Sequence, residues 1–284
     1  MTNYDKFLKN IPIMPDVSTK ILSFAEDLAE VSFSELEDLI SLDPGLTAKI
    51  LKVANSALYA RQQQITRLQT AISLMGFKAI KSLVILITAS NMFQKSALTP
   101  FYKYFWQHSL ITAFIAKKLS EITGQQRLKE EAFLAGLLHD IGQLALYESQ
   151  AGGYDSIMEY INQDEATTCK MEISLFGADH LSVGRKIMEN WNFPSIYADV
   201  AGEHGNANIQ STHKELIVLI SIADILTSVL HEIEFSPEVQ KYLHPFLLYS
   251  GLELKKLNYF QEQFMIDLKE DPLFQECRSL FRIN

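Results

Sequence analysis

Apolar residues recur every three or four positions along most of the chain, which is the spacing of one face of an α-helix. One such stripe comprises Val17, Ile21, Phe24 and Leu28, and a second comprises, approximately, Leu46, Ile50, Val53 and Leu58. The strict alternation of apolar and polar residues that marks a half-buried strand is almost absent. The pattern predicts an all-α protein.

Helix-breaking residues interrupt this pattern at intervals that fit separate helices. In Asp43-Pro44-Gly45, Asp43 is suited to cap a helix and Pro44 to occupy its first position. Asn55-Ser56 is expected to mark the far end or a bend of that helix. Further breaks are expected at Pro12, Pro15, Gly76, Pro100, Gly124, Gly152-Gly153 and Pro194.

The chain shows no repeat of fixed period and no low-complexity linker, so two helical subdomains packed together are the simplest interpretation. The one plausible internal boundary lies around Lys95 to Thr99, ahead of Pro100 and the aromatic cluster FYKYFWQH. We expect an N-terminal helical half at residues 1–98 and a second half at residues 99–232. A C-terminal extension at residues 233–284 is expected to pack its helices on this body.

The charge of the chain bears on its partners. The 25 Lys and Arg residues stand against 34 Asp and Glu residues, a formal net charge of −9, so the molecule as a whole repels nucleic acid and anionic membranes. A helix-turn-helix DNA reader is an alternative interpretation of Thr47, Lys49, Lys52 and Arg61. These residues lack the dense basic footprint of DNA binding, and neither nucleic acid nor membrane is expected as a partner.

Other features of the sequence indicate a compartment. No apolar run approaches the roughly 20 residues that span a bilayer, and the start, MTNYDKFLKN, is too polar for a secretory signal. The two cysteines, Cys169 and Cys277, are far apart and give neither metal-ligand spacing nor a disulfide framework. We expect a cytoplasmic protein.

Six ionisable residues lie on faces that are otherwise apolar. In the stretch LLHDIGQL, His139 and Asp140 stand side by side on a helix that is expected to turn both toward apolar neighbours. His108 shares its predicted helix face with Ile111 and Ile115. The complete set is His108, His139, Asp140, His180, His204 and Asp224.

Such residues need compensation if they point into a core. Burying an isolated carboxylate costs several kcal/mol even after relaxation, so each group requires a counter-charge, a hydrogen bond or a metal. A divalent cation would satisfy all six together, because imidazole and carboxylate suit Fe, Mn, Zn, Ni or Co. For His180 or His204 taken alone, a hydrogen bond to a backbone carbonyl is the commoner explanation. His213, His231 and His244 are expected to have no functional role.

The order His, His-Asp, His, His, Asp resembles the HD superfamily of metal-dependent phosphohydrolases. The segments IPIMPDVSTKIL, LISLDPGLTAKILKVANSALY and LQTAISLMGFKAIKSLVI resemble the N-terminal half of HDOD domains, the HD-related output domains of bacterial signalling. FWQHSL, EEAFLAGLLHDIGQLAL and FGADHLSVGRKIMENWNFP resemble their second half. The resemblance covers roughly Ile11 to Leu230.

The resemblance implies an all-α fold with a helical N-terminal subdomain and a second subdomain related to the HD phosphohydrolase core. It implies that a first metal is held by His108, His139, Asp140 and Asp224. His180 and His204 match positions that serve a second metal in the HD-GYP relatives. If the protein is an enzyme, Asp140 is the catalytic residue, acting through a metal that polarises phosphate and activates water.

The chain also departs from the pattern of the HD-GYP enzymes. They usually read HDIGK, where the lysine can meet substrate phosphate, whereas Gln143 takes that place here and carries no charge. The segment after His204, GNANIQSTH, contains nothing like the GYP signature. Cleavage of a cyclic dinucleotide is therefore not expected.

Two functions remain. The chain is interpreted first as a signalling module that acts through a protein partner docked on its N-terminal helices, with the HD half as a metal-containing or ligand-sensing core. The alternative is a metal-dependent phosphohydrolase acting on a nucleotide or another phosphoester. The ligand set favours the enzyme, whereas Gln143, the missing signature and the acidic charge favour the module.

Overall fold

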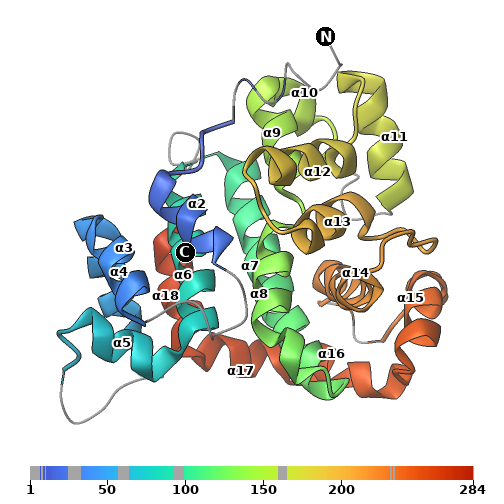
Figure 1. The fold of residues 1–284 in the computed structure, drawn as a ribbon. Coiled ribbons are helices and arrows are strands. Elements are labelled where there is room, and N and C mark those ends of the chain that lie inside the picture. The colour runs from blue at the N-terminus through green and yellow to red at the C-terminus, as the bar shows by residue number, and fades with distance from the viewer. Residues whose placement is uncertain are drawn as a thin grey trace.

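The structure, a computed structural model, describes residues 7, 9, 11–24, 33–56, 64–92, 99–158, 165–230, 232 and 234–283. Within these residues all regular structure is helical and no strand occurs, so the predicted all-α class is confirmed (Figure 1). Leu28, Leu58, Arg61, His231 and residues 95–98 of the predicted boundary segment lie outside the described residues.

The N-terminal half contains α2 (Asp16–Ser23), α3 (Phe33–Ser41), α4 (Pro44–Ala54), α5 (Leu68–Met75) and α6 (Phe77–Met92). The second half contains α7 (Pro100–Ile122), the 3₁₀ turn η2 (Gln126–Leu128), α8 (Lys129–Leu138), α9 (Ile141–Ser149), α10 (Ala151–Asp155), α11 (Glu165–Phe176), α12 (His180–Asn190), α13 (Ser195–Glu203) and α14 (Lys214–Ser228). The C-terminal part contains α15 (Pro237–Ser250), η3 (Leu254–Leu257), α16 (Asn258–Glu262), α17 (Phe264–Glu270) and α18 (Pro272–Phe281).

Capping residues followed by proline begin several of these helices. The Asp43 side chain accepts hydrogen bonds from the backbone N–H groups of Gly45 and Leu46, and Pro44 is the first residue of α4, as predicted. Asn55 caps the far end of that helix, also as predicted. The same local rule operates where a side-chain oxygen caps the helix and proline follows, which happens at Thr99-Pro100, Ser236-Pro237 and Asp271-Pro272.

Helix α7 lies at the centre of the molecule, where it contacts α8, α14 and α18 (Figure 1). Trp106 of α7 is fully buried and stacks on Phe281 of α18, with ring centroids 4.1 Å apart. Helix α18 also contacts α6, so the C-terminal helices pack on both halves. One cluster of buried apolar side chains extends from Phe7 to Ile283. The boundaries at residues 98/99 and 232/233 stay predictions.

Polar contacts also join the two halves. The Trp191 indole N–H, beyond the end of α12, donates to the carbonyl oxygen of Pro12 at 3.1 Å. Lys78 of α6 pairs with the buried carboxylate of Glu131 on α8. These links fix the N-terminal helices against the half that carries the six ionisable residues.

No single helix in the described part of the chain is long and apolar enough to cross a membrane. Helices α5 and α6 pass a test of length and composition only when they are taken together, and they are bent by 114° at the break between them.

Helices α9 and α12 approach each other closely at Gly142. A Cβ atom at Gly142 would lie 2.0 Å from the carbonyl oxygen of His180 and 2.8 Å from the amide nitrogen of Gly184. Backbone cannot yield as a flexible side-chain end can, so only glycine fits this position. Gly184 itself has room, because its nearest neighbour, the Cβ of Ala201, would lie 3.4 Å from an added Cβ.

We predict that Gly142→Ala lowers the free energy of unfolding by about 1–3 kcal/mol or more, the usual cost of overpacking a rigid contact. Gly184→Ala on the facing helix is the matched control and is expected to cost less than about 1 kcal/mol, chiefly because it meets only ordinary van der Waals neighbours. Urea unfolding curves measure both changes. Equal stability of the two variants would contradict the close approach.

Candidate metal centre

Two of the six ionisable residues project from the middle of long helices. His108 lies on α7, and Asp224 lies on α14, which packs against α7. Each follows the apolar stripe of its helix, so both point inward as predicted. The His108 ring is buried, and the Asp224 side chain is 17% exposed.

The prediction that His139 and Asp140 lie within one helix is wrong. They form the break between α8, which ends at Leu138, and α9, which begins at Ile141. Successive side chains on a continuous helix point about 100° apart, whereas the break at Asp140 (φ −94°, ψ 13°) directs both side chains to one centre. The Asp140 carboxylate accepts no capping hydrogen bond from α9. It is therefore available to residues on other helices.

His180 and His204 also lie at helix ends. His180 is the first residue of α12, whose cap is Asp179, and His204 follows the last residue of α13. Both imidazoles are fully buried. Asp140, His180 and His204 lie at the ends of α9, α12 and α13. These three helix ends meet, so they bring three of the six residues to one point.

The Asp140 carboxylate occupies the centre of the group. One of its oxygens, Oδ2, lies 3.2 Å from Nε2 of His139 and 3.7 Å from Nε2 of His108. The other, Oδ1, lies 3.2 Å from Nε2 of His204 and 3.6 Å from Nε2 of His180. The structure thus brings all four imidazoles within 3.7 Å of a single carboxylate, two on each side.

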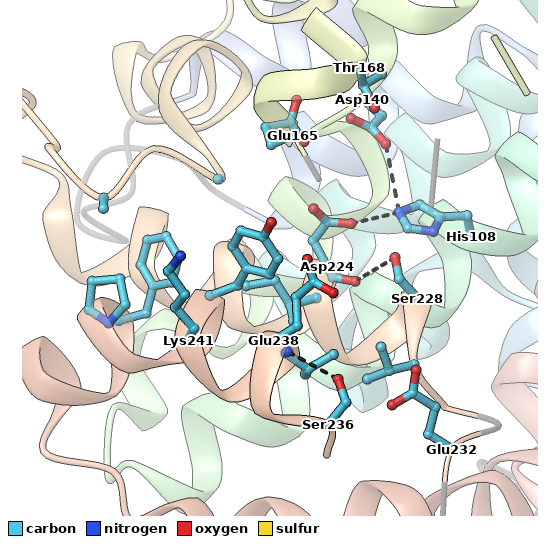
Figure 2. A pocket seen from close by; sticks show the side chains of 18 of the residues that line it. His108, Asp140, Glu165, Thr168, Asp224, Ser228, Glu232, Ser236, Glu238 and Lys241 are labelled. Atoms are coloured by element: carbon cyan, nitrogen blue, oxygen red, sulfur yellow. Dashed lines mark hydrogen bonds and ion pairs between the residues drawn. The ribbon is translucent and has the colours of Figure 1, made fainter. Parts of the chain in front are cut away.

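Asp224 joins the side of the cluster that contains His108 and His139. Its Oδ1 lies 3.0 Å from Nε2 of His108 and 3.7 Å from Nε2 of His139. Figure 2 shows Asp224 and Asp140 approaching His108 from different helices. All six residues singled out from the sequence therefore meet in one cluster.

Hydrogen bonds at Nδ1 set the tautomers of three imidazoles. Nδ1 of His139 lies 2.8 Å from the carbonyl oxygen of Gly136, and Nδ1 of His204 lies 2.9 Å from that of Val200. Nδ1 of His180 lies 2.6 Å from the Glu172 carboxylate. Each partner only accepts hydrogen bonds, so Nδ1 carries the hydrogen. In the neutral ring, Nε2 then presents a lone pair to the carboxylates at the centre.

A lone pair facing a carboxylate is repulsive unless a proton or a cation lies between them. Burial opposes a charge on His139, but Asp140 and Asp224 outweigh it and raise the pKa of His139 to about 10. Burial also opposes a charge on Asp140, but His139 and His204 outweigh this effect and hold the pKa of Asp140 well below the usual value. Protons therefore balance the cluster when no cation does.

Glu172 supports the cluster and was not predicted from the sequence. It is fully buried on α11 and accepts hydrogen bonds from the Tyr154 hydroxyl at 2.7 Å and from the backbone N–H of His180 at 2.8 Å. Burial opposes a charge on His180, but Glu172 and Glu165 raise its pKa well above the usual value. A carboxylate that orients a ligating imidazole is the usual outer shell of a metal site.

Three more residues near the cluster were missed. Glu165 of α11 places Oε1 2.8 Å from Nε2 of His180. It lies seven positions before Glu172, a spacing that puts both on one helix face and was the only signal in the sequence. Tyr104 stacks on His108 one helical turn away, and burial with the charges of Asp140 and Asp224 raises its pKa. Cys169 donates a weak hydrogen bond to Glu165 at 3.4 Å.

The remaining histidines that are described lie apart from the cluster. His213 precedes the first residue of α14, makes no side-chain capping hydrogen bond, and contacts Asp199 through Nδ1 at 2.8 Å. His244 is exposed on α15.

The residues of the cluster fit a divalent cation. Nε2 of His108, His139 and His180 is buried, and among the described residues its contacts with carboxylates do not have the geometry of hydrogen bonds. Ligands about 2.1 Å from a cation lie about 3.0–3.4 Å apart, close to the distances found here. Two sets of ligand atoms drawn from the six, His108 with His139 and Asp224, and His139 with Asp140 and His204, each lie within 4.8 Å of one another.

A cavity of about 850 Å³ opens on the cluster (Figure 2). His108, Asp140 and Asp224 line its inner end, and α15 forms the opposite wall. The sequence analysis expected the C-terminal helices to pack on the body and did not include a part for them in lining a cavity. Gln143, which carries no charge, also lines the cavity.

The fold and the cluster define a class, the all-α proteins with an HD-type arrangement of histidines and aspartates. The pattern of the HDOD domain matches residues 11–207, more than half of the chain, and the protein belongs to this family. An uncharacterized protein of Treponema pallidum (strain Nichols) is 22% identical over 219 residues, 77% of this chain and 42% of that protein. The chain thus spans less than half the length of this curated relative.

Solved structures share the fold. An HDOD domain protein of unknown function from Geobacter sulfurreducens has a TM-score of 0.73 at 20% identity and covers 98% of this chain and 97% of its own. A provisionally assigned signal transduction protein from Marinobacter aquaeolei VT8 has a TM-score of 0.73 at 21% identity, and the match covers 96% of this chain and 60% of that protein's chain. A provisionally assigned phosphohydrolase from Shewanella amazonensis SB2B has the same TM-score at 20% identity, over 98% of each chain.

We predict that Glu172→Gln lowers the free energy of unfolding by about 3–5 kcal/mol, because an amide cannot accept all three hydrogen bonds and leaves a buried imidazole unpaired. Glu189→Gln, which breaks the exposed pair with Lys186 on α12, is the control and should cost less than about 1 kcal/mol. Thermal and urea unfolding measure both. A small effect at Glu172 would mean that His180 is positioned by other contacts.

Proposed function

We propose that this protein is a regulatory HDOD module whose HD half binds divalent cations and that acts through a protein partner. The observation that supports it is the convergence of four Nε2 atoms on the two carboxylates of Asp140 and Asp224. One cation would occupy the side of the cluster formed by His108, His139 and Asp224. Asp140 has an oxygen on each side and would bridge to a second cation near His180 and His204.

The charge of the cavity determines what can enter it. Its lining contains five carboxylates and one lysine, Lys241. Without cations this lining repels phosphate. A phosphate-bearing ligand would therefore bind after the cations, which supply Lewis acidity and lower the pKa of bound water.

The wall opposite the cluster suits an apolar group. Val239, Tyr242, Pro245 and Phe246 of α15 line it. A ligand that places phosphate at the cations would lay its organic part against this wall. Gln143 adds a neutral polar contact where a lysine would have supplied charge, so binding depends on the cations more than on basic side chains.

The N-terminal half is the proposed docking surface for the partner. It exposes large apolar side chains at Ile13, Phe33 and Leu42. Surface substitutions there should abolish capture of the partner and change stability by no more than about 0.5 kcal/mol.

We predict that Mn²⁺ raises the melting temperature of metal-free protein. At a free concentration 100 times the dissociation constant, a cation that binds only the folded state stabilises it by about 2.7 kcal/mol. Binding should also release protons, because ligating imidazoles must lose theirs. Differential scanning fluorimetry and a pH-indicator titration measure the two effects.

Asp140→Ala and Asp224→Ala should remove the rise in melting temperature. His213→Ala is the control, because this histidine pairs with Asp199 apart from the cluster and the rise should remain. A wild-type protein that neither gains stability nor releases protons with Mn²⁺, Fe²⁺, Zn²⁺, Ni²⁺ or Co²⁺ would refute the metal-binding function.

The second candidate function is metal-dependent hydrolysis of a nucleotide or another phosphoester. The open cavity at the cluster favours it, since a purely structural metal site is closed. Asp140 would be the catalytic residue, because its two oxygens face the two sides of the cluster and would contact both cations.

If the protein is a hydrolase, Mn²⁺-loaded protein should release p-nitrophenol from p-nitrophenyl phosphate or bis(p-nitrophenyl) phosphate. Asp140→Asn should reduce the rate to background, and His213→Ala should retain it. Absorbance at the p-nitrophenolate band follows the reaction. Cation binding without turnover of either ester would leave the regulatory module as the function.

A further inference from the structure

We infer that Glu165 is a seventh ligand of the metal centre and completes the cation position on the side of His180 and His204. The inference rests on the proposed cation binding and adds a residue outside the His, His-Asp, His, His, Asp order. Glu165 is the first residue of α11, and its carboxylate lies at the inner end of the cavity (Figure 2).

The contact between Glu165 and His180 requires something positive between the two atoms. Nδ1 of His180 donates its hydrogen to Glu172, so Nε2 of the neutral ring has a lone pair. This Nε2 atom lies 2.8 Å from Oε1 of Glu165. Nε2 of His180 is buried, and in the described structure its contact with Glu165 does not have the geometry of a hydrogen bond. A cation bound by both atoms would turn this repulsive contact into a shared ligand set.

The Glu165 carboxylate reaches both imidazoles on this side. Its ligand atoms lie within 4.8 Å of those of Cys169 and His180 in one set, and of His204 and Asp224 in another. Together with Oδ1 of Asp140, 3.6 Å from His180 and 3.2 Å from His204, Glu165 would bring this position to two nitrogens and two oxygens. Such a mixed set suits Mn, Fe, Zn or Co.

The backbone after His204 is shaped to admit the Glu165 side chain. Gly205 has a φ of +73°, and a Cβ atom added there would lie 2.6 Å from Cγ of Glu165 and 3.1 Å from its Cβ. The Glu165 side chain therefore occupies the space that a Cβ atom at position 205 would need, next to His204. Any larger residue at 205 would push the carboxylate away from the centre.

Glu165 would also restrict what the centre binds. Two divalent cations and the carboxylates of Asp140 and Asp224 leave a charge of +2, and Glu165 lowers it to +1. The carboxylate lies where the cavity meets the cluster, so an incoming phosphate oxygen would compete with it for the same cation. Glu165 is thus expected to hold the second cation and to weaken the binding of anions.

The test titrates metal-free wild type and Glu165→Gln with Mn²⁺, followed by isothermal calorimetry and by electron paramagnetic resonance of free Mn²⁺. Wild type should bind two equivalents. Glu165→Gln should weaken the second by at least about tenfold, as ligand-shell changes do, and leave the first unchanged. Inorganic phosphate should bind the Mn²⁺-saturated variant more tightly than wild type.

Glu238→Gln is the matched control, since it removes the same charge from the lining of the same cavity but lies on α15. It should leave both equivalents unchanged. Gly205→Ala should reproduce the loss of the second equivalent with Glu165 intact, and circular dichroism checks that each variant is folded.

The outcomes separate the two proposals. If wild type binds two equivalents and Glu165→Gln binds both as tightly, Glu165 only pairs with a protonated His180, and the inference is overturned while cation binding stands. A single equivalent that is unaffected by Glu165→Gln has the same meaning. No binding of Mn²⁺, Fe²⁺, Zn²⁺, Ni²⁺ or Co²⁺ to wild type would overturn both.

Discussion

The buried carboxylate of Asp140 is the constraint on which the rest of the site depends. A carboxylate in a protein interior needs positive charge or hydrogen-bond donors on every side. Here each oxygen faces two imidazoles, His108 and His139 on one side and His180 and His204 on the other. Those imidazoles come from α7, the α8–α9 break, α12 and α13. Compensating one charge thus fixes the relative positions of most of the second half.

The chain meets this constraint with helix ends. A helix side can present one residue in three or four to a given point, whereas a terminus adds a residue whose direction is set by the local backbone. His139 and Asp140 use a break, His180 a start and His204 an end. The close contact of Gly142 in α9 with the carbonyl of His180 in α12 holds α12 next to the break between α8 and α9. Packing and site geometry are therefore parts of one arrangement.

The surroundings of the cluster bear on the cations that we propose for it. The cavity beside it is lined by more carboxylates than basic groups, so its electrostatics select against anions until cations are bound. In this chain, Gln143 and Glu165 both reduce the positive charge available to a phosphate. With the cations that we propose, the site would be better suited to holding cations than to binding highly charged substrates.

The sequence by itself determined the helical class, the capped start of α4 and the six residues of the cluster. Helical periodicity is a local property, and a buried ionisable residue on an apolar stripe is visible without the fold. Proline after a capping residue is equally local. These features follow from neighbouring residues along one helix, so no tertiary contact was needed to predict them.

Only the tertiary structure decided the break at Asp140, the roles of Glu165, Glu172 and Tyr104, and the cavity wall made by α15. Glu172 lies on a helix with a weak apolar stripe, and nothing in its neighbours indicates that it meets His180 and Tyr154. The break between α8 and α9 has no proline at its position, and the imidazoles of other segments converge on Asp140 there. Contacts between distant segments depend on how helices pack, and packing is not encoded in the periodicity of any one of them.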